Sequence, residues 1–267
     1  MRGKRKRGDV NEFASRLADN LHELYSDLAS EKYIHGSYEE YMICDPKKRI
    51  VHKASVRDRI VHRLIYNALY QYFDTRFIFD SFSCRKGKGT HKARARFRHF
   101  TNQVSKNYTK QCYVLKFDIK KCFTSIDTDV LKDMLVQHLV DEKLLKVVLN
   151  IVDSFRPGLP LGNLTSQLFI NIYLHELDRY AKKVIGVVYY IRYADDVVIV
   201  STSPEYVRKL MDDMTIFILN VLNLQVHKVQ IQSIYAGVDI VGEIFFPKYT
   251  TLRRSTVRRI SNRQLIL

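Results

Sequence analysis

The sequence predicts an α+β fold in which helices pack on one face of an antiparallel sheet. Apolar residues recur at helical spacing in several stretches, and short runs rich in β-branched residues lie between those stretches. No repeat and no Pro- or Ser-rich linker divides the chain. With 267 residues and 46% hydrophobic content, the chain can bury a substantial core. A single continuous fold is therefore expected.

Helices are expected wherever apolar side chains return every three or four positions, because this spacing builds one apolar face. The stretches that show this pattern are residues 12–28, 58–73, 128–139, 166–183 and 207–222. The fourth ends at Lys182, Lys183 and Gly186, and basic residues followed by glycine are typical of a helix end.

Strands are expected at residues 112–119, at residues 187–191 and 197–201, and at residues 238–246, where the pattern fits a strand or a hairpin. In the first of these, alternation places Val114, Lys116 and Asp118 on one face. The second and third flank five residues that include two acids, which predicts a hairpin with those acids at its tip.

The charge of the chain favours a polyanionic partner. Lys and Arg number 44 against 28 Asp and Glu, which gives a formal charge of +16. Nucleic acid fits this charge better than a membrane surface, because no apolar run is long enough to span a bilayer. Cys44, Cys84, Cys112 and Cys122 lack zinc-site spacing, so we interpret them as reduced packing residues of a cytoplasmic protein.

Three carboxylates stand out against apolar surroundings. Asp118 ends one predicted strand, while Asp195 and Asp196 lie at the hairpin tip. An Asp pair in a turn often serves only turn geometry and solubility. These acids instead interrupt apolar segments that are expected to be buried strands. Pairing of the strands would bring the negatively charged carboxylates together, and cations would have to neutralise them. Hard oxygen ligands favour Mg²⁺, and a pair of such ions suits phosphoryl transfer.

Motifs around these acids resemble those of reverse transcriptases. The matching stretches are residues 193–196 (YADD), 118–127 (DIKKCFTSID) and 158–167 (GLPLGNLTSQ), and the likeness extends over about residues 36–247. The resemblance implies a right-hand polymerase fold. Its expected divisions are an N-terminal helix and fingers in residues 1–105, a palm in 106–247, and the start of a thumb or a basic tail in 248–267. The thumb would then be short or missing.

The resemblance also implies roles for individual residues. Asp118, Asp195 and Asp196 would be catalytic ligands of two Mg²⁺ ions, with Mn²⁺ as a substitute. Phe123 would exclude a ribose 2′-hydroxyl, so that the product is DNA, and Lys228 would protonate pyrophosphate. Phe123 could instead be ordinary core.

Substrate and nucleic-acid contacts follow from the same resemblance. The expected substrate-binding residues are Lys47, Arg49, Phe123, Leu161, Gly162 and Gln167. The expected nucleic-acid contacts are Arg85, Lys86, Lys88, Val241 and Gly242, where the last two would support the primer end. The basic side chains could instead be solvated surface charges. The partners would be template RNA, a primer or cDNA, and dNTPs.

Leu161 and the Ser166–Gln167 pair depart from the usual family pattern. They resemble the reverse transcriptases of diversity-generating retroelements, which are error-prone and act with a small basic accessory protein. Retron, defence and group II intron-type enzymes share most of the other motifs, so these types stay open. Outside this family, the alternatives are an RNA polymerase with the same palm, against which Phe123 argues, and a nucleic-acid-binding protein with an inactive palm.

Overall fold

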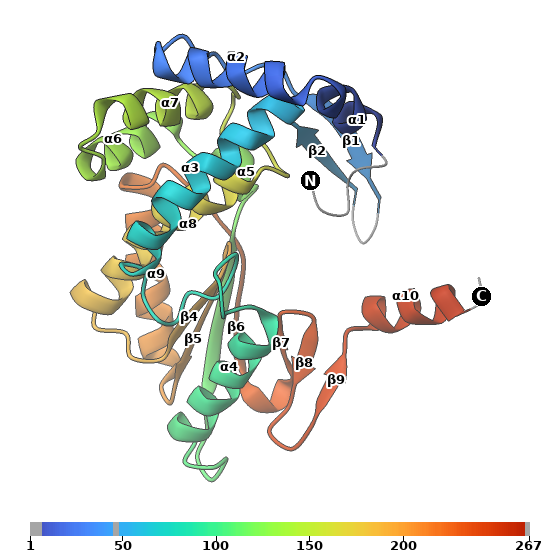
Figure 1. The fold of residues 1–267 in the computed structure, drawn as a ribbon. Coiled ribbons are helices and arrows are strands. Elements are labelled where there is room, and N and C mark those ends of the chain that lie inside the picture. The colour runs from blue at the N-terminus through green and yellow to red at the C-terminus, as the bar shows by residue number, and fades with distance from the viewer. Residues whose placement is uncertain (1–6, 45–47, 265–267) are drawn as a thin grey trace. The chain divides into compact units, whose positions relative to one another are not determined.

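The computed structural model describes residues 7–44 and 48–264, and side chains as far as residue 261. Packing divides the chain into two compact units (Figure 1). The first combines the chain up to Arg76 with Lys121–Leu174, and the second combines Phe77–Lys120 with the chain from His175 onward. The expected divisions at residues 105 and 247 remain predictions.

The first unit is mainly helical. Its elements are α1 (Gly8–Ser15), α2 (Leu17–Ala29), the hairpin of β1 (Glu39–Ile43) and β2 (Arg49–Lys53), α3 (Val56–Asp74), α5 (Cys122–Ser125), α6 (Thr128–His138) and α7 (Glu142–Asp153). Side-chain caps begin three of the helices: Ser55 caps α3, Asp127 caps α6 and Asp141 caps α7. α8 (Leu164–Arg179) begins in this unit and ends in the second.

The second unit contains the larger sheet. Its elements are α4 (Thr90–Val104), β3 (Tyr113–Ile119), a π-helical turn (Tyr180–Val184), β4 (Tyr190–Tyr193), β5 (Asp196–Ser201), α9 (Pro204–Asn220), β6 (Val226–Ser233), a 3₁₀ turn (Ile234–Ala236), β7 (Val238–Ile240), β8 (Glu243–Phe245), β9 (Thr250–Leu252) and α10 (Arg254–Gln264). β7, β8 and β9 form a separate antiparallel sheet.

The main sheet has the strand order β4-β5-β3-β6, and every neighbouring pair is antiparallel. Val114, Val198 and Val200 share a buried cluster with Phe97 and Phe100 of α4. The alternate positions of the strands face the other way, and α9 packs against β3, β5 and β6. The α+β class is confirmed, but helices cover both faces of the sheet rather than one, because both faces are apolar.

Most predicted elements are present with shifted ends. The predicted helix over residues 12–28 is wrong in one respect, because it is two helices separated at Arg16, whose φ of −124° and ψ of 43° are not helical. The expected strand 187–191 starts only at Tyr190, and the stretch 238–246 forms the hairpin of β7 and β8. The prediction lacked β6, which pairs with β3 along its length.

All four cysteines are free. Cys112 and Cys122 are buried, as expected of packing residues, whereas Cys44 and Cys84 are exposed and the prediction is wrong for them. In the part of the chain that the structure describes, no helix has both the length and the apolar character needed to cross a membrane.

Candidate active site

Asp118 lies near the end of β3, the strand between β5 and β6. Its neighbour in β6 is His227, and the register of the two strands shifts between Lys116 and Asp118. Lys228, which follows His227, has a left-handed φ of 50°. Such an irregularity redirects side chains at a strand end. As a result, Lys228 Nζ lies 3.4 Å from Asp118 Oδ2, which brings two predicted site residues together.

The hairpin of β4 and β5 carries the other two acids. Tyr193 pairs with Asp196, so Ala194 and Asp195 form the tip, and Ala194 has a left-handed φ of 55°. β5 pairs with β3 through Phe117 and Val197. One step further along this antiparallel register, Asp118 comes opposite Asp196. The structure therefore brings together acids that are separated by more than seventy positions in the chain.

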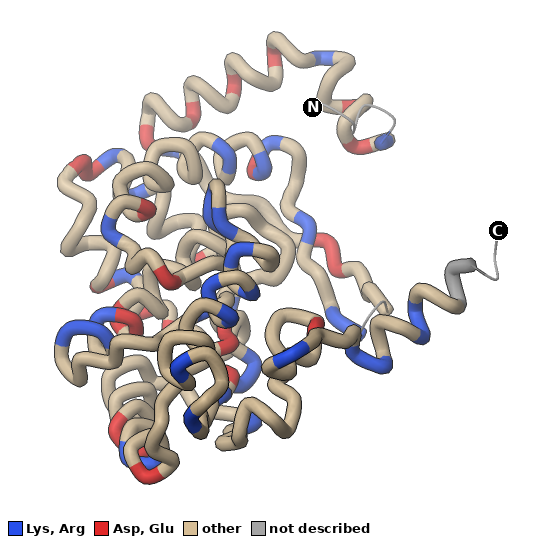
Figure 2. The backbone as a smooth tube through the Cα atoms, turned by 90° about the horizontal axis from the view of Figure 1, so that it is seen from below, with Lys and Arg blue, Asp and Glu red and all other residues tan. Residues whose placement is uncertain are grey.

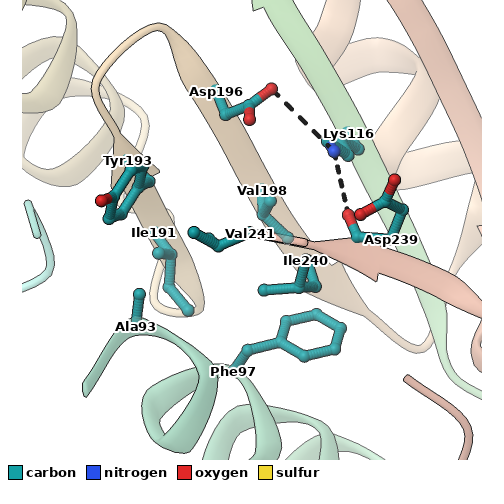
Figure 3. Close-up of a pocket in the computed structure, with 10 residues that line it drawn as sticks. All are labelled: Ala93, Phe97, Lys116, Ile191, Tyr193, Asp196, Val198, Asp239, Ile240 and Val241. Atoms are coloured by element: carbon teal, nitrogen blue, oxygen red, sulfur yellow. Dashed lines mark hydrogen bonds and ion pairs between the residues drawn. The ribbon is translucent and has the colours of Figure 1, made fainter. Parts of the chain in front are cut away.

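Electrostatics agree with this proximity. Burial raises the pKa of Asp196, the Lys116 ammonium group lowers it, and the negative charge of Asp118 raises it again, with a net rise. The ammonium nitrogen of Lys116 lies 3.9 Å from Asp196 Oδ1 and donates to Asp239 O at 2.9 Å (Figure 3). Asp239 is itself paired with Arg253. Lys116, Asp239 and Arg253 were absent from the predicted site, although the alternation of β3 already placed Lys116 on the face of Asp118.

The carboxylates offer the kind of ligand that a divalent cation takes. Asp118 Oδ1 is buried and has no hydrogen-bond partner among the described residues. An orphaned carboxylate oxygen is costly unless a cation or a donor reaches it, and carboxylate oxygens suit Mg²⁺. In the residues that the structure describes, however, no three His, Cys, Asp or Glu side chains already form a metal cage. The donor set fits a metal, and the orphaned oxygen is the observation that supports it.

Phe123 belongs to the first unit and lies in the short helix α5, where it is partly buried. Its carbonyl oxygen accepts a hydrogen bond from Leu159 N at 2.7 Å. Gly158, which precedes Leu159, has a φ of 71°, and a Cβ at this position would overlap the carbonyl oxygen of Phe123 and the backbone of Thr124. The segment around Gly158 thus packs directly on the backbone that carries Phe123.

Leu161 and Gly162 contact the hairpin of β1 and β2. The backbone N–H of His52 donates to Leu161 O at 2.8 Å, and a Cβ on Gly162 would overlap Val51. Gln167 lies in α8 and is partly buried, and Arg49 begins β2 and is exposed. Lys47 lies outside the described residues. The first unit thus holds Arg49, Phe123, Leu161, Gly162 and Gln167, and the second holds the acids, Lys228 and the predicted nucleic-acid contacts.

Arg85 and Lys88, which are predicted nucleic-acid contacts near α4, make hydrogen bonds within the protein. Arg85 donates to Ile78 O at 2.7 Å and to Ser81 O at 3.0 Å. Lys88 donates to Phe79 O at 2.8 Å and lies 3.4 Å from the centre of the Phe79 ring. Lys86 is exposed. Further cations of this unit are Arg254, Arg258 and Arg259 of α10, and Figure 2 shows the blue positions along this helix near the C-terminus.

Val241 and Gly242 form the two-residue turn between β7 and β8, with φ values of 44° and 92°. A positive φ is rare for a β-branched residue. Arg94 of α4 stabilises this turn through its two terminal guanidinium nitrogens. One donates to Val241 O at 2.7 Å, and the other forms an ion pair with Glu243 at 2.7 Å. The sequence did not indicate Arg94 separately from its basic neighbours.

Comparisons with known proteins agree with the geometry. The family model described as "Reverse transcriptase (RNA-dependent DNA polymerase)" matches residues 45–248. An "Uncharacterized 91 kDa protein in cob intron" of Schizosaccharomyces pombe is 27% identical over 143 residues, which is 50% of this chain and 17% of that protein. A "Putative COX1/OXI3 intron 2 protein" of Saccharomyces cerevisiae is 22% identical over 158 residues, 54% of this chain and 16% of that protein.

Solved structures show the same fold at low sequence identity. Apo telomerase of Candida tropicalis superposes with a TM-score of 0.59 at 14% identity, covering 87% of this chain and 53% of that one. Telomerase of Candida albicans in complex with a fragment of telomeric RNA gives 0.58 at 11% identity, with 86% and 50% covered. The chain thus spans about half the length of these structures and less than a fifth of the curated relatives. By the family match, this chain belongs to the reverse transcriptase family.

Proposed function

We propose that this chain is an RNA-directed DNA polymerase that copies a template RNA from a primer, using dNTPs and Mg²⁺. The observation that supports this most strongly is the meeting of Asp118 with the β4–β5 hairpin, where Asp118 Oδ1 is buried without a partner among the described residues. Fold and family membership supply the context. The proposal also places the protein in the reducing environment of the cytoplasm, and it includes Mn²⁺ as a substitute for Mg²⁺.

Asp118, Asp195 and Asp196 would hold the cations. When bound, two divalent ions would activate the attacking primer hydroxyl and stabilise the charge of the leaving pyrophosphate. The protein residues around them have separate tasks. Lys228 carries a proton at Nζ beside Asp118, from which it can protonate the leaving group. Lys116 offsets the negative charge of Asp196 from within the same sheet.

The remaining assignments concern substrate and template. Phe123 would exclude a ribose 2′-hydroxyl by its bulk. Lys47 and Arg49 would hold the triphosphate. An ammonium group attracts phosphate as a point charge, and a guanidinium group can donate two parallel hydrogen bonds to it. Leu161, Gly162 and Gln167 would line the nascent base pair. Arg85, Lys86 and Lys88, with Val241 and Gly242, would contact template and primer, although Arg85 and Lys88 also serve the protein's own packing.

Primer extension on an RNA template tests the proposal directly. Asp118→Asn should lower extension in Mg²⁺ by about a hundredfold or more, because it removes a ligand charge that stabilises the transition state. Asp133→Asn is the matched control, since Asp133 is an exposed carboxylate on α6. An Asp118→Asn variant that extends normally, while binding of RNA depends on Arg49 and Lys88, would show a binding protein with an inactive palm instead.

The choice of sugar separates a reverse transcriptase from an RNA polymerase. The wild type should incorporate dNTPs in strong preference to rNTPs. Phe123→Ala should narrow that preference, because a smaller side chain leaves room for the 2′-hydroxyl. Comparing kcat/KM for a dNTP and the matching rNTP in both proteins measures this. Equal use of both sugars by the wild type would support the RNA polymerase.

Two subtypes of reverse transcriptase are candidates for this chain. The curated relatives are named as intron proteins, which favours an enzyme of the group II intron type. Leu161 favours a diversity-generating retroelement, because its side chain cannot donate the hydrogen bonds that glutamine would offer beside the nascent pair. That second type would bring a small basic accessory protein as partner. Retron and defence enzymes share the same core motifs.

Misincorporation opposite each template base distinguishes the two candidates. A retroelement enzyme should make frequent errors opposite adenine, and Leu161→Gln should reduce them. Uniformly low error in the wild type, with no change in Leu161→Gln, would favour the intron type. The assay uses the same primer and RNA with each base in turn at the first templating position.

A further inference from the structure

The largest fully buried side chain among the described residues is that of Arg192, a charged residue. Arg192 lies in β4, two positions before Ala194 and three before Asp195. Its partner is Asp178 in the last turn of α8, and neither side chain is exposed to solvent. Removing two charges from water costs several kcal/mol per ion, which their attraction and hydrogen bonds must offset. A contribution to stability alone therefore does not explain why a charged pair is buried at this position.

The geometry of the pair is complete. Arg192 Nε donates to Asp178 Oδ1 at 2.8 Å, and one terminal nitrogen donates to Asp178 Oδ2 at 2.7 Å. The hydroxyl of Tyr190 donates to Asp178 Oδ1 at 2.7 Å. Burial raises the pKa of Tyr190 well above its usual value, so this hydroxyl stays protonated and remains a donor. Asp178 is thus held by two residues of β4 and fixes the plane of the guanidinium group.

The other terminal nitrogen of Arg192 has a different target. It donates to the carbonyl oxygen of Ala194 at 3.0 Å. That oxygen lies in the same rigid peptide plane as the backbone nitrogen of Asp195. Ala194 has a left-handed φ of 55°, a conformation that costs energy for a residue with a side chain. The guanidinium group therefore holds the strained peptide that leads into Asp195.

The backbone of Arg192 is anchored as well. Its N–H donates to Asp80 O at 2.9 Å, and its carbonyl oxygen accepts from Phe82 N at 3.0 Å. β4 is an edge strand of the main sheet, so these bonds occupy its open side. The strand cannot slide without breaking them. Backbone and side chain together make Arg192 a rigid support for the hairpin tip.

We infer that Arg192 is a positioning residue for the acid-bearing hairpin: anchored on Asp178, it fixes the Ala194–Asp195 peptide and so the place where Asp195 and Asp196 meet Asp118. This inference rests on the proposed function and deepens it. Asp178 and Tyr190 act through Arg192. A loss of this support moves the acids without removing any of them.

Three variants separate positioning from folding. Arg192→Met leaves Asp178 as an unpaired buried charge, so it should lower both the melting temperature and kcat. The double variant Asp178→Leu/Arg192→Met removes both charges, and apolar replacement of a buried ion pair commonly restores stability. The kcat of this double variant should stay about tenfold or more below that of the wild type. Ala194 O has lost its donor, and small misplacements of reacting groups slow the reaction strongly. Leu135→Ala, at a fully buried position of α6 in the first unit, is the control that loses stability and keeps kcat.

The measurements are primer extension below the melting temperature of each variant and binding of Mn²⁺ by electron paramagnetic resonance. We expect the double variant to show a lower kcat, a KM for dNTP close to that of the wild type, and a weaker affinity for Mn²⁺. Recovery of kcat and Mn²⁺ affinity together with stability would overturn the inference, as would an equal loss of kcat in Leu135→Ala. If the wild type does not extend primers, the proposed function fails, and unchanged Mn²⁺ affinity in the double variant would separately refute positioning.

Discussion

Gly158 shows how a single residue can support a site through its lack of a side chain. It combines a left-handed φ of 71° with direct backbone contact to Phe123 and Thr124. Any other residue would be strained there and would also displace α5. The position of the residue expected to select the sugar therefore depends on a glycine that makes no contact with substrate in our proposal.

Gly158→Ala should lower the free energy of unfolding by about 3 kcal/mol or more, because left-handed strain and steric overlap add. Gly186→Ala is a matched control, since Gly186 has a φ of 80° and open space around it. Its expected cost is about 1–2 kcal/mol, from strain alone. Urea unfolding of both variants measures the difference. Equal losses would mean that the backbone of α5 yields easily to the added methyl group.

Arg94 is a second residue whose role depends on backbone conformation. It contacts both the carbonyl oxygen of Val241 and the carboxylate of Glu243, and so closes the strained turn between β7 and β8. A turn with positive φ at a valine is uncommon, and outside support is one reason for it to persist. If this turn supports the primer end, Arg94 determines its shape.

Arg94→Met should raise the KM for primer–template several-fold while kcat changes less, because the turn loses two anchors outside the acidic cluster. Arg98→Met serves as the control, since Arg98 is an exposed cation of the same helix. Steady-state primer extension at varied primer–template concentration gives both constants. A similar rise in both variants would indicate a general loss of charge rather than a loss of turn geometry.

At the scale of elements, α9 is the helix behind the acid-bearing strands. It packs on β3, β5 and β6 through Val207, Leu210, Met214 and other buried residues. Ser203 caps the helix by accepting a hydrogen bond from Tyr206 N at 3.0 Å, and Pro204 follows at the first position. Apolar spacing alone predicted this helix within a few residues of its observed ends, because that spacing lies in one short stretch of the chain.

Ser203→Ala should lower the free energy of unfolding by about 1 kcal/mol, the usual value of an N-cap side chain. Ser203→Thr keeps a hydroxyl at the same position and should retain most of the stability. Thermal unfolding compares the three proteins. The prediction is wrong if threonine costs as much as alanine, since the hydroxyl would then contribute nothing.

Other elements could not be predicted from local pattern. β6 is an edge strand with mostly exposed or half-exposed residues, so it lacks the apolar alternation that reveals a half-buried strand. The break at Arg16 separates two helices whose apolar spacing continues across it. In both cases the pairing or packing partner lies elsewhere in the chain, and only the folded molecule supplies it.

At the scale of the whole molecule, a buried histidine pair in the first unit makes stability depend on pH. His62 Nε2 lies 3.0 Å from His35 Nε2, and His62 Nδ1 lies 2.6 Å from Thr165 Oγ1. Burial, followed by the charge of His35, lowers the pKa of His62 from 6.5 to about 4. Between these two values the unfolded chain binds more protons at His62 than the folded protein does.

The protein should therefore lose stability as the pH falls from about 6.5 toward 4, by ~3 kcal/mol from this group when the shift is converted directly. His62→Gln should be less sensitive to pH over this range, whatever its stability at neutral pH. His22→Gln, at an exposed position of α2, is the control and should follow the wild type. Urea unfolding at several pH values gives the slopes, and equal slopes in His62→Gln and the wild type would contradict the prediction.

Sequence patterns alone predicted the α+β class, the helices α3, α6, α8 and α9, and the acids as candidates, because each of these depends on residues close together along the chain. They did not predict α4 or α7. The family motifs around Asp118 and residues 193–196 were likewise readable without coordinates.

Which charged side chains lie next to one another became known from the folded structure alone. It placed Lys228 beside Asp118 and Lys116 beside Asp196, and it directed Arg85 and Lys88 partly into the protein. It also buried Arg192 against Asp178, a pair that no local sequence pattern connects. The physical reason is that helix and strand periodicity are local properties, whereas strand register, burial and ion pairing depend on segments that meet only when the chain folds.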